Sequence, residues 1–337
     1  RQGDLHDRLL GERFIARDIS RYIREYNPDI PIIWGGVFPT VSADTTIACE
    51  YIDYICVGEG IEALPELLEA IEAGKDGTGI KNIYAKKAGE IFRNENRPLF
   101  EDLDSLPYVD WDIFDKRQFY KPFDGNIVVG GDWMSNWGCP YRCTYCINNW
   151  LNRLAKRKLR RYSPERAVDE LEYLQKKYHL TFMRFHDEDF LMRPIEHLRE
   201  FGQLYSDRVG LPFSIETNPH SVTDEKVTIL KEMGIASASL AIESGNEYIR
   251  KTILKRVDSL DDIVRAFSYF YENGIRTSSF NMLGLPFEDR SKIFDTIEIN
   301  RKARPTVADS GFFFPFEATE LHDISVKNNF YTKEEVP

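Results

Sequence analysis

The chain has 337 residues, with 44 Lys and Arg against 55 Asp and Glu, and a net charge of −11. Its 42% hydrophobic and 29% charged residues are typical of a globular protein with a sizeable core, which disfavours a disordered chain or a disulfide scaffold. The acidic balance argues against a protein that binds nucleic acid mainly by electrostatics, and no apolar run is long enough for a transmembrane helix.

The first 75 residues alternate short apolar strands with amphipathic helices. The patterns predict helices at 12–27, 42–49 and 62–71 and strands at 30–34 and 52–57. Such an alternation favours a parallel α/β sheet. Two strand–helix units are too few for a complete open sheet, so we expect the chain to begin inside a larger domain. Residues 76–98 are expected to form a small polar hairpin or loop region.

A second, stronger alternation begins at residue 126, after an aromatic and Pro-containing segment, 99–125, that we interpret as a linker. Predicted strands are 127–130, 182–186, 213–217, 237–242, 277–283 and 311–316, the last with a core stretch at 312–316. Predicted helices are 164–178, 194–208, 223–233, 246–254, 259–273 and 288–302. Six units are fewer than the eight of a full barrel, which predicts an incomplete one. The expected domains are therefore 1–98 and 126–337, joined by 99–125.

Three of the five cysteines lie in one short segment, GCPYRCTYC: Cys139, Cys143 and Cys146. The segment follows the first predicted barrel strand, so it belongs to a loop at the carboxyl ends of the strands, where barrel enzymes place their sites. A secreted disulfide protein spreads its cysteines and holds an even number. Clustered thiols in a chain whose first residues do not resemble a signal peptide predict a metal site in a reducing cytoplasm.

The kind of metal site follows from the number of thiols. Three thiolates on one loop can bind three corners of a cubane iron–sulfur cluster, which normally has four cysteine ligands. One iron would then stay open to a ligand that is not protein. Zinc would need a fourth Cys or His at a defined spacing, and no His follows within thirty residues. An iron–sulfur cluster is favoured over zinc and over three unliganded thiols.

The cysteine loop resembles the signature of the radical S-adenosylmethionine (SAM) superfamily, with Tyr145 at the aromatic position before the last cysteine. The resemblance covers roughly residues 125–330. It implies a partial (β/α)6 barrel of the TIM type, a [4Fe-4S] cluster on Cys139, Cys143 and Cys146, and SAM bound to the open iron through its amino and carboxylate groups. It also implies reductive cleavage of SAM to a 5′-deoxyadenosyl radical that abstracts hydrogen from a substrate.

The same resemblance assigns SAM-binding roles to polar residues at other strand ends. Asp187 and Glu188 match the place that holds the SAM amino group, where acids accept N–H bonds; the alternative is a solvated acidic turn. Glu243 matches a polar residue near the ribose, where a carboxylate accepts hydroxyl protons. Nearby Glu216, Asn218, His186 and His220 are candidates to face the substrate.

Two further segments complete the implied SAM site. Lys255 and Arg256 match the basic position that binds the SAM carboxylate; the alternative is a helix C-terminus, where cations are favoured anyway. Gly284 and Leu285 lie in a turn that resembles the family's GxPxE turn, whose backbone meets the adenine. A glycine there permits a close approach.

The amino-terminal segment resembles the second half of a cobalamin-binding Rossmann domain. The residues that carry this resemblance follow the two predicted strands: Gly35, Gly36, Phe38, Gly58, Glu59 and Gly60. The family often has His where Phe38 stands, and after Asp4-Leu5-His6 no Gly occupies position 9, so the Asp-x-His-x-x-Gly loop is absent. Bound cobalamin would then have no protein histidine below cobalt. The alternative is an α/β domain that binds no cofactor.

These observations predict a cobalamin-dependent radical SAM enzyme, with methyl transfer from methylcobalamin to an unactivated carbon as the expected reaction. One alternative is a radical SAM enzyme for cyclisation, ring contraction or another rearrangement, with or without cobalamin. Another is a non-catalytic iron–sulfur or cobalamin-binding sensor. The expected partners are a small-molecule or peptide substrate and a flavodoxin- or ferredoxin-type electron donor, with no nucleic acid, in an anaerobic cytoplasm.

Overall fold

The computed structural model describes residues 3–155 and 159–332, with side chains described from residue 15 onwards. The Asp4-Leu5-His6 segment therefore lies outside the described side chains. Two compact units form: an amino-terminal unit of residues 3–100, 316–318 and 326–332, and a barrel unit of residues 101–155, 159–315 and 319–325. Of the segment 99–125, which the sequence suggested as a linker, residues 99–100 fall in the amino-terminal unit and residues 101–125 in the barrel unit.

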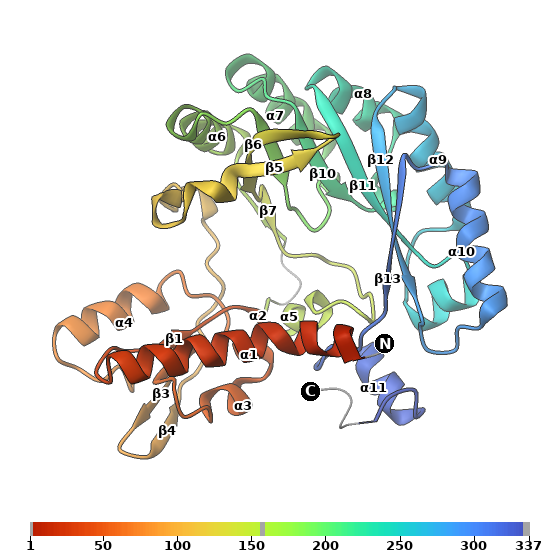
Figure 1. Cartoon of the computed structure of the whole chain (residues 1–337). Helices are drawn as coiled ribbons and strands as arrows, with labels where there is room; N and C mark the ends of the chain where they lie inside the picture. The colour runs from red at the N-terminus through yellow and green to blue at the C-terminus, as the bar shows by residue number, and fades with distance from the viewer. Residues whose placement is uncertain (1–2, 156–158, 333–337) are drawn as a thin grey trace. The chain divides into compact units, whose positions relative to one another are not determined.

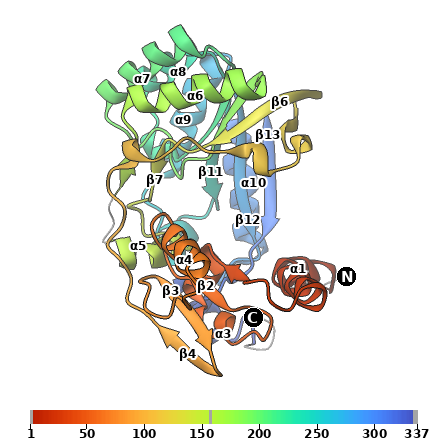
Figure 2. The ribbon, with the colours of Figure 1, turned by 90° about the vertical axis from the view of Figure 1, so that its left-hand side faces the viewer.

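The amino-terminal unit contains a four-stranded sheet in the order β1-β2-β3-β4. Its strands are β1 (Ile33–Trp34), β2 (Tyr54–Cys56), β3 (Ile83–Lys87) and β4 (Glu90–Arg93). Its helices are α1 (Gly3–Tyr26), α2 (Val37–Val41), α3 (Ala43–Ile47) and α4 (Ala63–Glu72). β1 and β2 are parallel, and β3–β4 is an antiparallel hairpin at the sheet edge (Figure 2), which confirms the predicted hairpin.

The barrel unit is built on a seven-stranded sheet in the order β13-β12-β11-β10-β9-β6-β5, curled into part of a barrel (Figure 1). The strands are β5 (Tyr120–Phe123), β6 (Asn126–Trp133), β9 (Phe182–Phe185), β10 (Phe213–Thr217), β11 (Ile235–Glu243), β12 (Arg276–Leu283) and β13 (Val307–Phe312). In this sheet β6, β9, β10, β11, β12 and β13 pair in parallel, and β5 runs antiparallel to β6. The predicted α/β fold with an incomplete barrel is confirmed.

Helices lie along one face of this sheet (Figure 1). They are α6 (Pro164–Tyr178), α7 (Ile195–Arg208), α8 (Asp224–Glu232), α9 (Leu260–Glu272) and α10 (Arg290–Ala303), with α5 (Asn148–Ala155) and α11 (Glu320–Lys327) outside this row. Short elements fill the connections: η1 (Leu103–Ser105), η2 (Trp111–Ile113), η3 (Lys116–Phe119), β7 (Asn136–Trp137), β8 (Arg160–Arg161), η4 (Pro219–Ser221) and η5 (Ile249–Ile253), a π-helical turn.

The strand alternation decides which side chains face the helices. Phe185 of β9 packs its ring 6.0 Å from Phe201 and 6.1 Å from Tyr205 of α7, and Phe213 of β10 lies 5.3 Å from Tyr205. All four are fully buried, and burial of each stabilises the fold by roughly 1.5–3 kcal/mol. Because neighbouring side chains point to opposite faces, Arg184, Ser214 and Glu216 lie on the face without helices.

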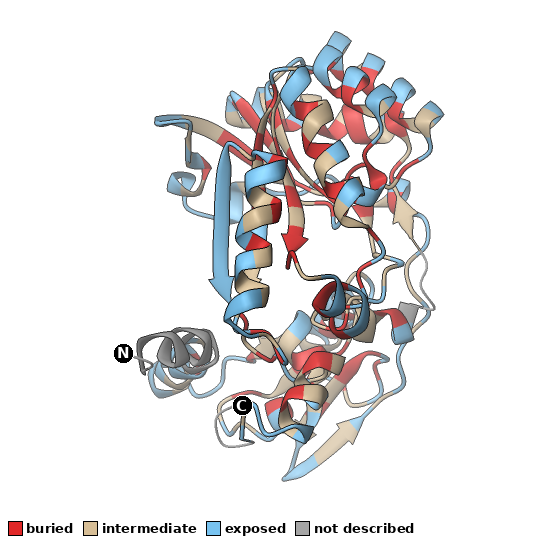
Figure 3. Cartoon of the chain, turned by 90° about the vertical axis from the view of Figure 1, so that its right-hand side faces the viewer, coloured by how far each residue is buried: buried red, intermediate tan, exposed pale blue. Residues whose placement is uncertain are grey.

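The last strand departs from the sequence prediction. β13 begins four residues earlier than expected and is exposed along its whole length (Figure 3). The expectation that 312–316 is core is wrong: Phe312 is 73% and Phe316 53% exposed, and Phe313 is buried. The reason is its place at the sheet edge, where β13 pairs with β12 alone. A run of aromatic residues does not show which strand stands at an edge.

Candidate functional site

The cysteine loop connects β7 with α5 and is fastened to the end of η5, the π-helical turn that follows β11. The buried Thr144 donates its backbone N–H to the carbonyl of Leu254 (3.1 Å) and its hydroxyl to that of Ile253 (2.6 Å). Its own carbonyl accepts from the N–H of Leu321 (2.9 Å). All five cysteines of the chain are free thiols. The three loop thiols are thus held by the backbone around them.

Burial raises the pKa of all three loop thiols, to about 12 for Cys139 and about 11 for Cys146. The neighbouring thiols and the Glu188 carboxylate raise the pKa of Cys139 and Cys146 further. Thiolates at this place therefore require a nearby cationic group, as metal ions provide. The donor set fits a metal centre built on sulfur ligands.

The arrangement distinguishes a cluster from a single ion. Across residues 3–155 and 159–332, no group of three His, Cys, Asp or Glu side chains converges as the ligands of one metal ion would. A cubane cluster has a different requirement, because each cysteine binds a different iron at a different corner. Three cysteines on one short loop offer one thiolate for each of three corners of such a cluster.

The three acids after β9 differ in their surroundings. Asp187 is fully buried, and its Oδ1 accepts from the N–H groups of Ser135 (3.0 Å) and Asn136 (2.7 Å). Asp189 is fully buried and accepts from the hydroxyls of Thr217 and Ser221. Glu188 between them is exposed and lies close to the cysteine thiols. Of the two acids predicted to meet the SAM amino group, only Glu188 is open to a ligand.

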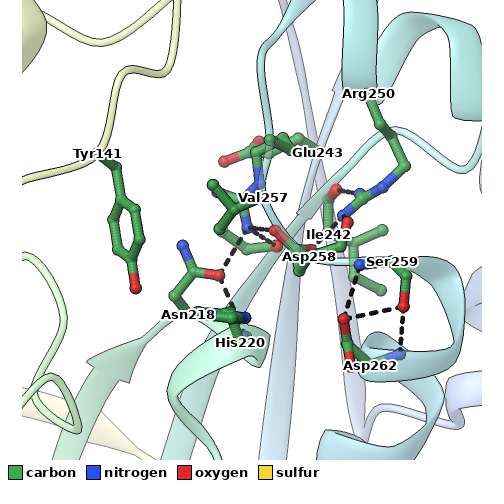
Figure 4. Close-up of polar contacts among 12 residues, drawn as sticks. Tyr141, Asn218, His220, Ile242, Glu243, Arg250, Val257, Asp258, Ser259 and Asp262 are labelled. Atoms are coloured by element: carbon green, nitrogen blue, oxygen red, sulfur yellow. Dashed lines mark hydrogen bonds and ion pairs between the residues drawn. The ribbon is translucent and has the colours of Figure 1, made fainter.

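The structure brings the predicted residues Tyr145, Glu243 and Arg256 together. Figure 4 shows Glu243 and Asn218 of this group. The Tyr145 hydroxyl donates to Glu243 Oε1 (3.0 Å) and accepts from Arg256 Nη1 (3.2 Å). Arg256 Nη2 also donates to Asn218 Oδ1 (3.2 Å) and to the carbonyl of Ala241 (2.8 Å). Burial raises the pKa of both the Tyr145 hydroxyl and the Glu243 carboxyl.

Two charged residues that the sequence analysis missed support this group. Asp258 is fully buried, pairs with Arg250 and lies 3.1 Å from Arg256 Nη2. Arg250, also fully buried, donates to the carbonyls of Ile242 and Ser244 on either side of Glu243. We call the group the buried cluster; it consists of Tyr145, Asn218, Glu243, Arg250, Arg256 and Asp258. A single sequence does not separate buried charges from surface charges, so only the structure reveals these two.

The buried cluster holds Glu243 in a rare backbone conformation. Its φ of +68° lies in the left-handed region, which costs a non-glycine residue of order 1 kcal/mol. Gly245, two residues further on, is fastened to α10: its N–H donates to Thr296 Oγ1 (2.9 Å), and a Cβ on Gly245 would lie 2.1 Å from the carbonyl oxygen of Asp295. The Glu243 carboxylate is therefore placed by its backbone as well as by its partners.

Two predicted segments lie outside the buried cluster. Lys255 is exposed and pairs with Glu320 instead, so Arg256 is the basic residue that joins Glu243. In the turn after β12, Glu288 Oε2 accepts from the N–H groups of Gly284 (2.7 Å) and Leu285 (3.3 Å). Gly284 is exposed with φ +76°, whereas Leu285 is buried. The Glu288 carboxylate thus closes the turn, and Gly284 is the residue whose backbone is exposed.

The predicted glycine loops of the amino-terminal unit are joined by one side chain. The Thr40 hydroxyl donates to the carbonyl of Gly36 (2.7 Å) and accepts from the N–H of Gly58 (3.0 Å). Gly36 and Gly58 have positive φ angles of +95° and +86°, whereas the φ angle of Gly35 is not positive. Gly35 and Gly36 are exposed, Phe38, Gly58, Glu59 and Gly60 are partly exposed, and Glu59 accepts from the N–H of Phe100 (3.0 Å).

Residues 137–299, from the cysteine loop to α10, match the sequence profile of the radical SAM superfamily. These residues belong to the radical SAM superfamily. This domain contains the three loop cysteines and every residue of the buried cluster, and it ends within α10. The match places the cysteine loop at the start of a known catalytic domain and does not extend to the amino-terminal unit.

Two curated relatives and one solved structure extend the likeness of this radical SAM chain over both units. It is 24% identical over 318 residues to an uncharacterized methyltransferase of Pyrococcus horikoshii, covering 93% of the chain and 67% of the relative. It is 26% identical over 310 residues to the anaerobic magnesium-protoporphyrin IX monomethyl ester cyclase of Rubrivivax gelatinosus, covering 88% of the chain and 54% of that relative.

Among solved structures, the radical SAM methyltransferase TsrM of Kitasatospora setae, with cobalamin and a [4Fe-4S] cluster bound, superposes with a TM-score of 0.73 at 18% identity, covering 93% of this chain and 60% of that one. This likeness shows a shared fold. The chain spans between about half and two thirds of the length of these proteins. No helix in the described part of the chain has the length and apolar character needed to cross a membrane.

Proposed function

We propose that the protein is a cobalamin-dependent radical SAM enzyme that methylates an unactivated carbon. The observation that carries the proposal is the cysteine loop fastened to η5, which follows the strand end that holds the buried cluster. When bound, the [4Fe-4S] cluster supplies the electron that cleaves SAM to a 5′-deoxyadenosyl radical. The fold shared with a cobalamin-binding methyltransferase supports the methyl transfer.

Different residues of the barrel unit would bind different groups of SAM. Cys139, Cys143 and Cys146 would bind the cluster and leave one iron for SAM. Glu188, exposed beside the thiols, would accept from the amino group, and Glu243 from a ribose hydroxyl. Arg256 would pair with the carboxylate, because its guanidinium already lies in a buried, oriented position. The exposed backbone at Gly284 would meet the adenine.

The amino-terminal unit would hold cobalamin through its two glycine loops. A backbone without side chains at Gly35, Gly36, Gly58 and Gly60 allows a large cofactor to lie close. Phe38 and Glu59 belong to the same two loops. Because Phe38 stands where relatives often have His, the cofactor would lack a histidine ligand from this position.

The first experiment is anaerobic reconstitution with iron, sulfide and hydroxocobalamin, followed by metal analysis. We expect about four irons and one cobalt per chain. Cys143→Ala should lose the cluster, whereas Cys49→Ala, a cysteine of the amino-terminal unit, should keep it. Gly36→Ala should lower the cobalt content because of its positive φ, whereas Gly79→Ala, outside the two glycine loops and with no heavy atom within 4 Å of the added Cβ, should not. Zinc without iron would contradict the proposal.

A second candidate function is a radical cyclisation, which the likeness to the Rubrivivax cyclase favours. The two reactions differ in what becomes of SAM. Methyl transfer consumes SAM as a methyl donor and leaves S-adenosylhomocysteine beside 5′-deoxyadenosine. Cyclisation leaves methionine and 5′-deoxyadenosine without S-adenosylhomocysteine. Analysis of both products after one turnover in the presence of reductant decides between them.

The partners of this reaction are also part of the proposal. A flavodoxin- or ferredoxin-type protein would supply the electron, and the substrate would be a small molecule or a peptide. An oxygen-sensitive cluster fits the anaerobic cytoplasm predicted from the clustered thiols. Reduction of the reconstituted cluster by flavodoxin, followed by electron paramagnetic resonance, tests the donor directly.

A further inference from the structure

A second group of charged side chains lies on the face of the barrel sheet that carries no helices. It consists of Lys121, Asp132, Arg184, His186 and Glu216, and we call it the charged patch. Strand register places Asp132 of β6 beside Arg184 of β9, and Arg184 beside Ser214 of β10. Two residues further along their strands come His186 and Glu216, on the same face.

The charged patch is a connected network with two open ends. His186 Nε2 lies 2.9 Å from Asp132 Oδ1, and His186 Nδ1 lies 3.6 Å from Glu216 Oε1. Lys121 Nζ donates to Asp132 Oδ2 at 2.6 Å. The side chains of Arg184 and Glu216 are 41% and 46% exposed, the largest values in the patch.

The hydrogen bonds inside the patch set its charge. The carboxylates of Asp132 and Glu216 raise the pKa of His186 to about 9, so the imidazole is protonated at neutral pH. Burial alone would raise the pKa of Asp132, but the hydrogen bonds from His186 and Lys121 lower it to about 2. Three cations and two anions leave one positive charge in excess, in a chain whose net charge is −11.

The Arg184 guanidinium has N–H donors that are available to a ligand. Its Nε lies 3.7 Å from Asp132 Oδ1, and within residues 3–155 and 159–332 its guanidinium makes no hydrogen bond. In a network that served only to join the strands, every cationic side chain would be hydrogen-bonded to an acid. Partly exposed ion pairs also contribute little to stability. An exposed guanidinium instead matches the two oxygens of a carboxylate or a phosphate.

Along the strands, the charged patch comes just before the residues assigned to SAM. Asn218, which bonds Arg256, is two residues beyond Glu216, a step of about 7 Å along an extended chain. A group bound at Arg184 would therefore extend from the sheet face toward the strand ends where the radical would form.

We propose that the charged patch is a substrate-binding site, in which Arg184, supported by His186, binds an acidic group of the substrate, a carboxylate or a phosphate. Asp132 is the positioning residue that orients both cations, and Glu216 tunes the site by its negative charge. The proposal rests on the proposed function for its substrate role, but anion binding itself requires neither SAM nor cobalamin.

The test is an anion titration of the full chain with its cluster reconstituted and its histidine rings labelled with ¹⁵N. His186→Gln assigns the His186 signals among the six histidines. Sodium phosphate and sodium acetate are added separately at constant ionic strength, and we expect the His186 signals to shift to saturation. Saturation with phosphate alone identifies a phosphate group, and with acetate alone a carboxylate.

Three variants make the titration specific. Arg184→Gln should weaken anion binding by about tenfold or more, because a charge-assisted pair is lost. Glu216→Gln should strengthen it, because a repelling charge is removed. Arg199→Gln, an exposed arginine of α7 paired with Glu225, is the matched control and should bind like the unchanged protein. The affinity should also fall as the pH rises through about 9, where His186 loses its proton.

Equal affinity in Arg184→Gln and in the unchanged protein would overturn the proposal, and so would signals that stay constant in both salts. Iron content and SAM binding are measured on the same samples. They report on the proposed function alone, so a failure of the anion site and a failure of the radical SAM assignment give different results.

Discussion

The buried cluster and the charged patch both combine Arg, Asp and Glu side chains, yet they differ in burial. Arg250 and Asp258 are fully buried and bonded to each other, and Arg256 is 5% exposed. In the charged patch, Asp132 and Arg184 are 39% and 41% exposed. Burial makes the first group a fixed framework, whereas exposure leaves the second able to titrate and to exchange partners. The same charges thus serve two purposes.

The largest expected difference is in stability. Asp258→Asn leaves two buried arginines without a carboxylate, and breaking a buried pair costs about 3–5 kcal/mol of unfolding free energy. Asp132→Asn breaks ion pairs that water screens, and we expect this to lower the unfolding free energy by less than about 1 kcal/mol. Urea unfolding of both variants and the unchanged protein measures the difference. Equal losses would mean that burial does not separate the two groups.

The second difference concerns SAM. Arg256→Gln removes the cation assigned to the SAM carboxylate, and we expect SAM affinity to fall by about tenfold or more. Arg184→Gln removes a cation of the charged patch and should leave SAM affinity unchanged. Equilibrium dialysis with labelled SAM on the reconstituted proteins gives both values, and circular dichroism checks that each variant is folded. A loss of SAM binding in Arg184→Gln alone would reverse the two assignments.

A third difference is the response to pH. Because its pKa is raised from 6.5 to about 9, His186 stabilises the folded state fully below about pH 6.5. This contribution is lost as the pH rises through about 9. His186→Asn should therefore be less stable than the unchanged protein at pH 6 and approach it at pH 10. Urea midpoints across this range test the sign; a gap that widens with pH would contradict it.

Local patterns were sufficient to predict most elements of the barrel unit. The helix at 164–178 was predicted residue for residue, because Ser163 caps its start and Pro164 follows, while His179 ends it with φ +54°. The position of β13 was not predictable, since the sequence shows an apolar run but not which strand stands at the edge. An edge is a property of the whole sheet.

The same limit applies to the site. The cysteine spacing indicated the loop, and the resemblance to the radical SAM superfamily indicated Glu243 and Arg256. Asp187 illustrates what spacing leaves open: it looked equivalent to Glu188, but the structure turns it toward the backbone of Ser135 and Asn136. Which of two adjacent acids is buried depends on the strand twist and on β7, which no local pattern records.

The smallest expected difference lies in the response to salt, and it tests the comparison most directly. Coupling energies come from two double-mutant cycles, Lys121→Met with Asp132→Asn and Arg256→Gln with Asp258→Asn, each measured at 0.1 M and 1 M NaCl. The Debye length falls from about 10 Å to about 3 Å over this range, and it acts on charges that water reaches. The Lys121–Asp132 coupling should therefore fall toward zero, by less than about 1 kcal/mol. The Arg256–Asp258 coupling should stay constant, because no ions enter the space around two side chains that are 3% and 0% exposed. If both couplings fall together, water reaches the buried cluster, and its role as a fixed framework for SAM would have to be abandoned.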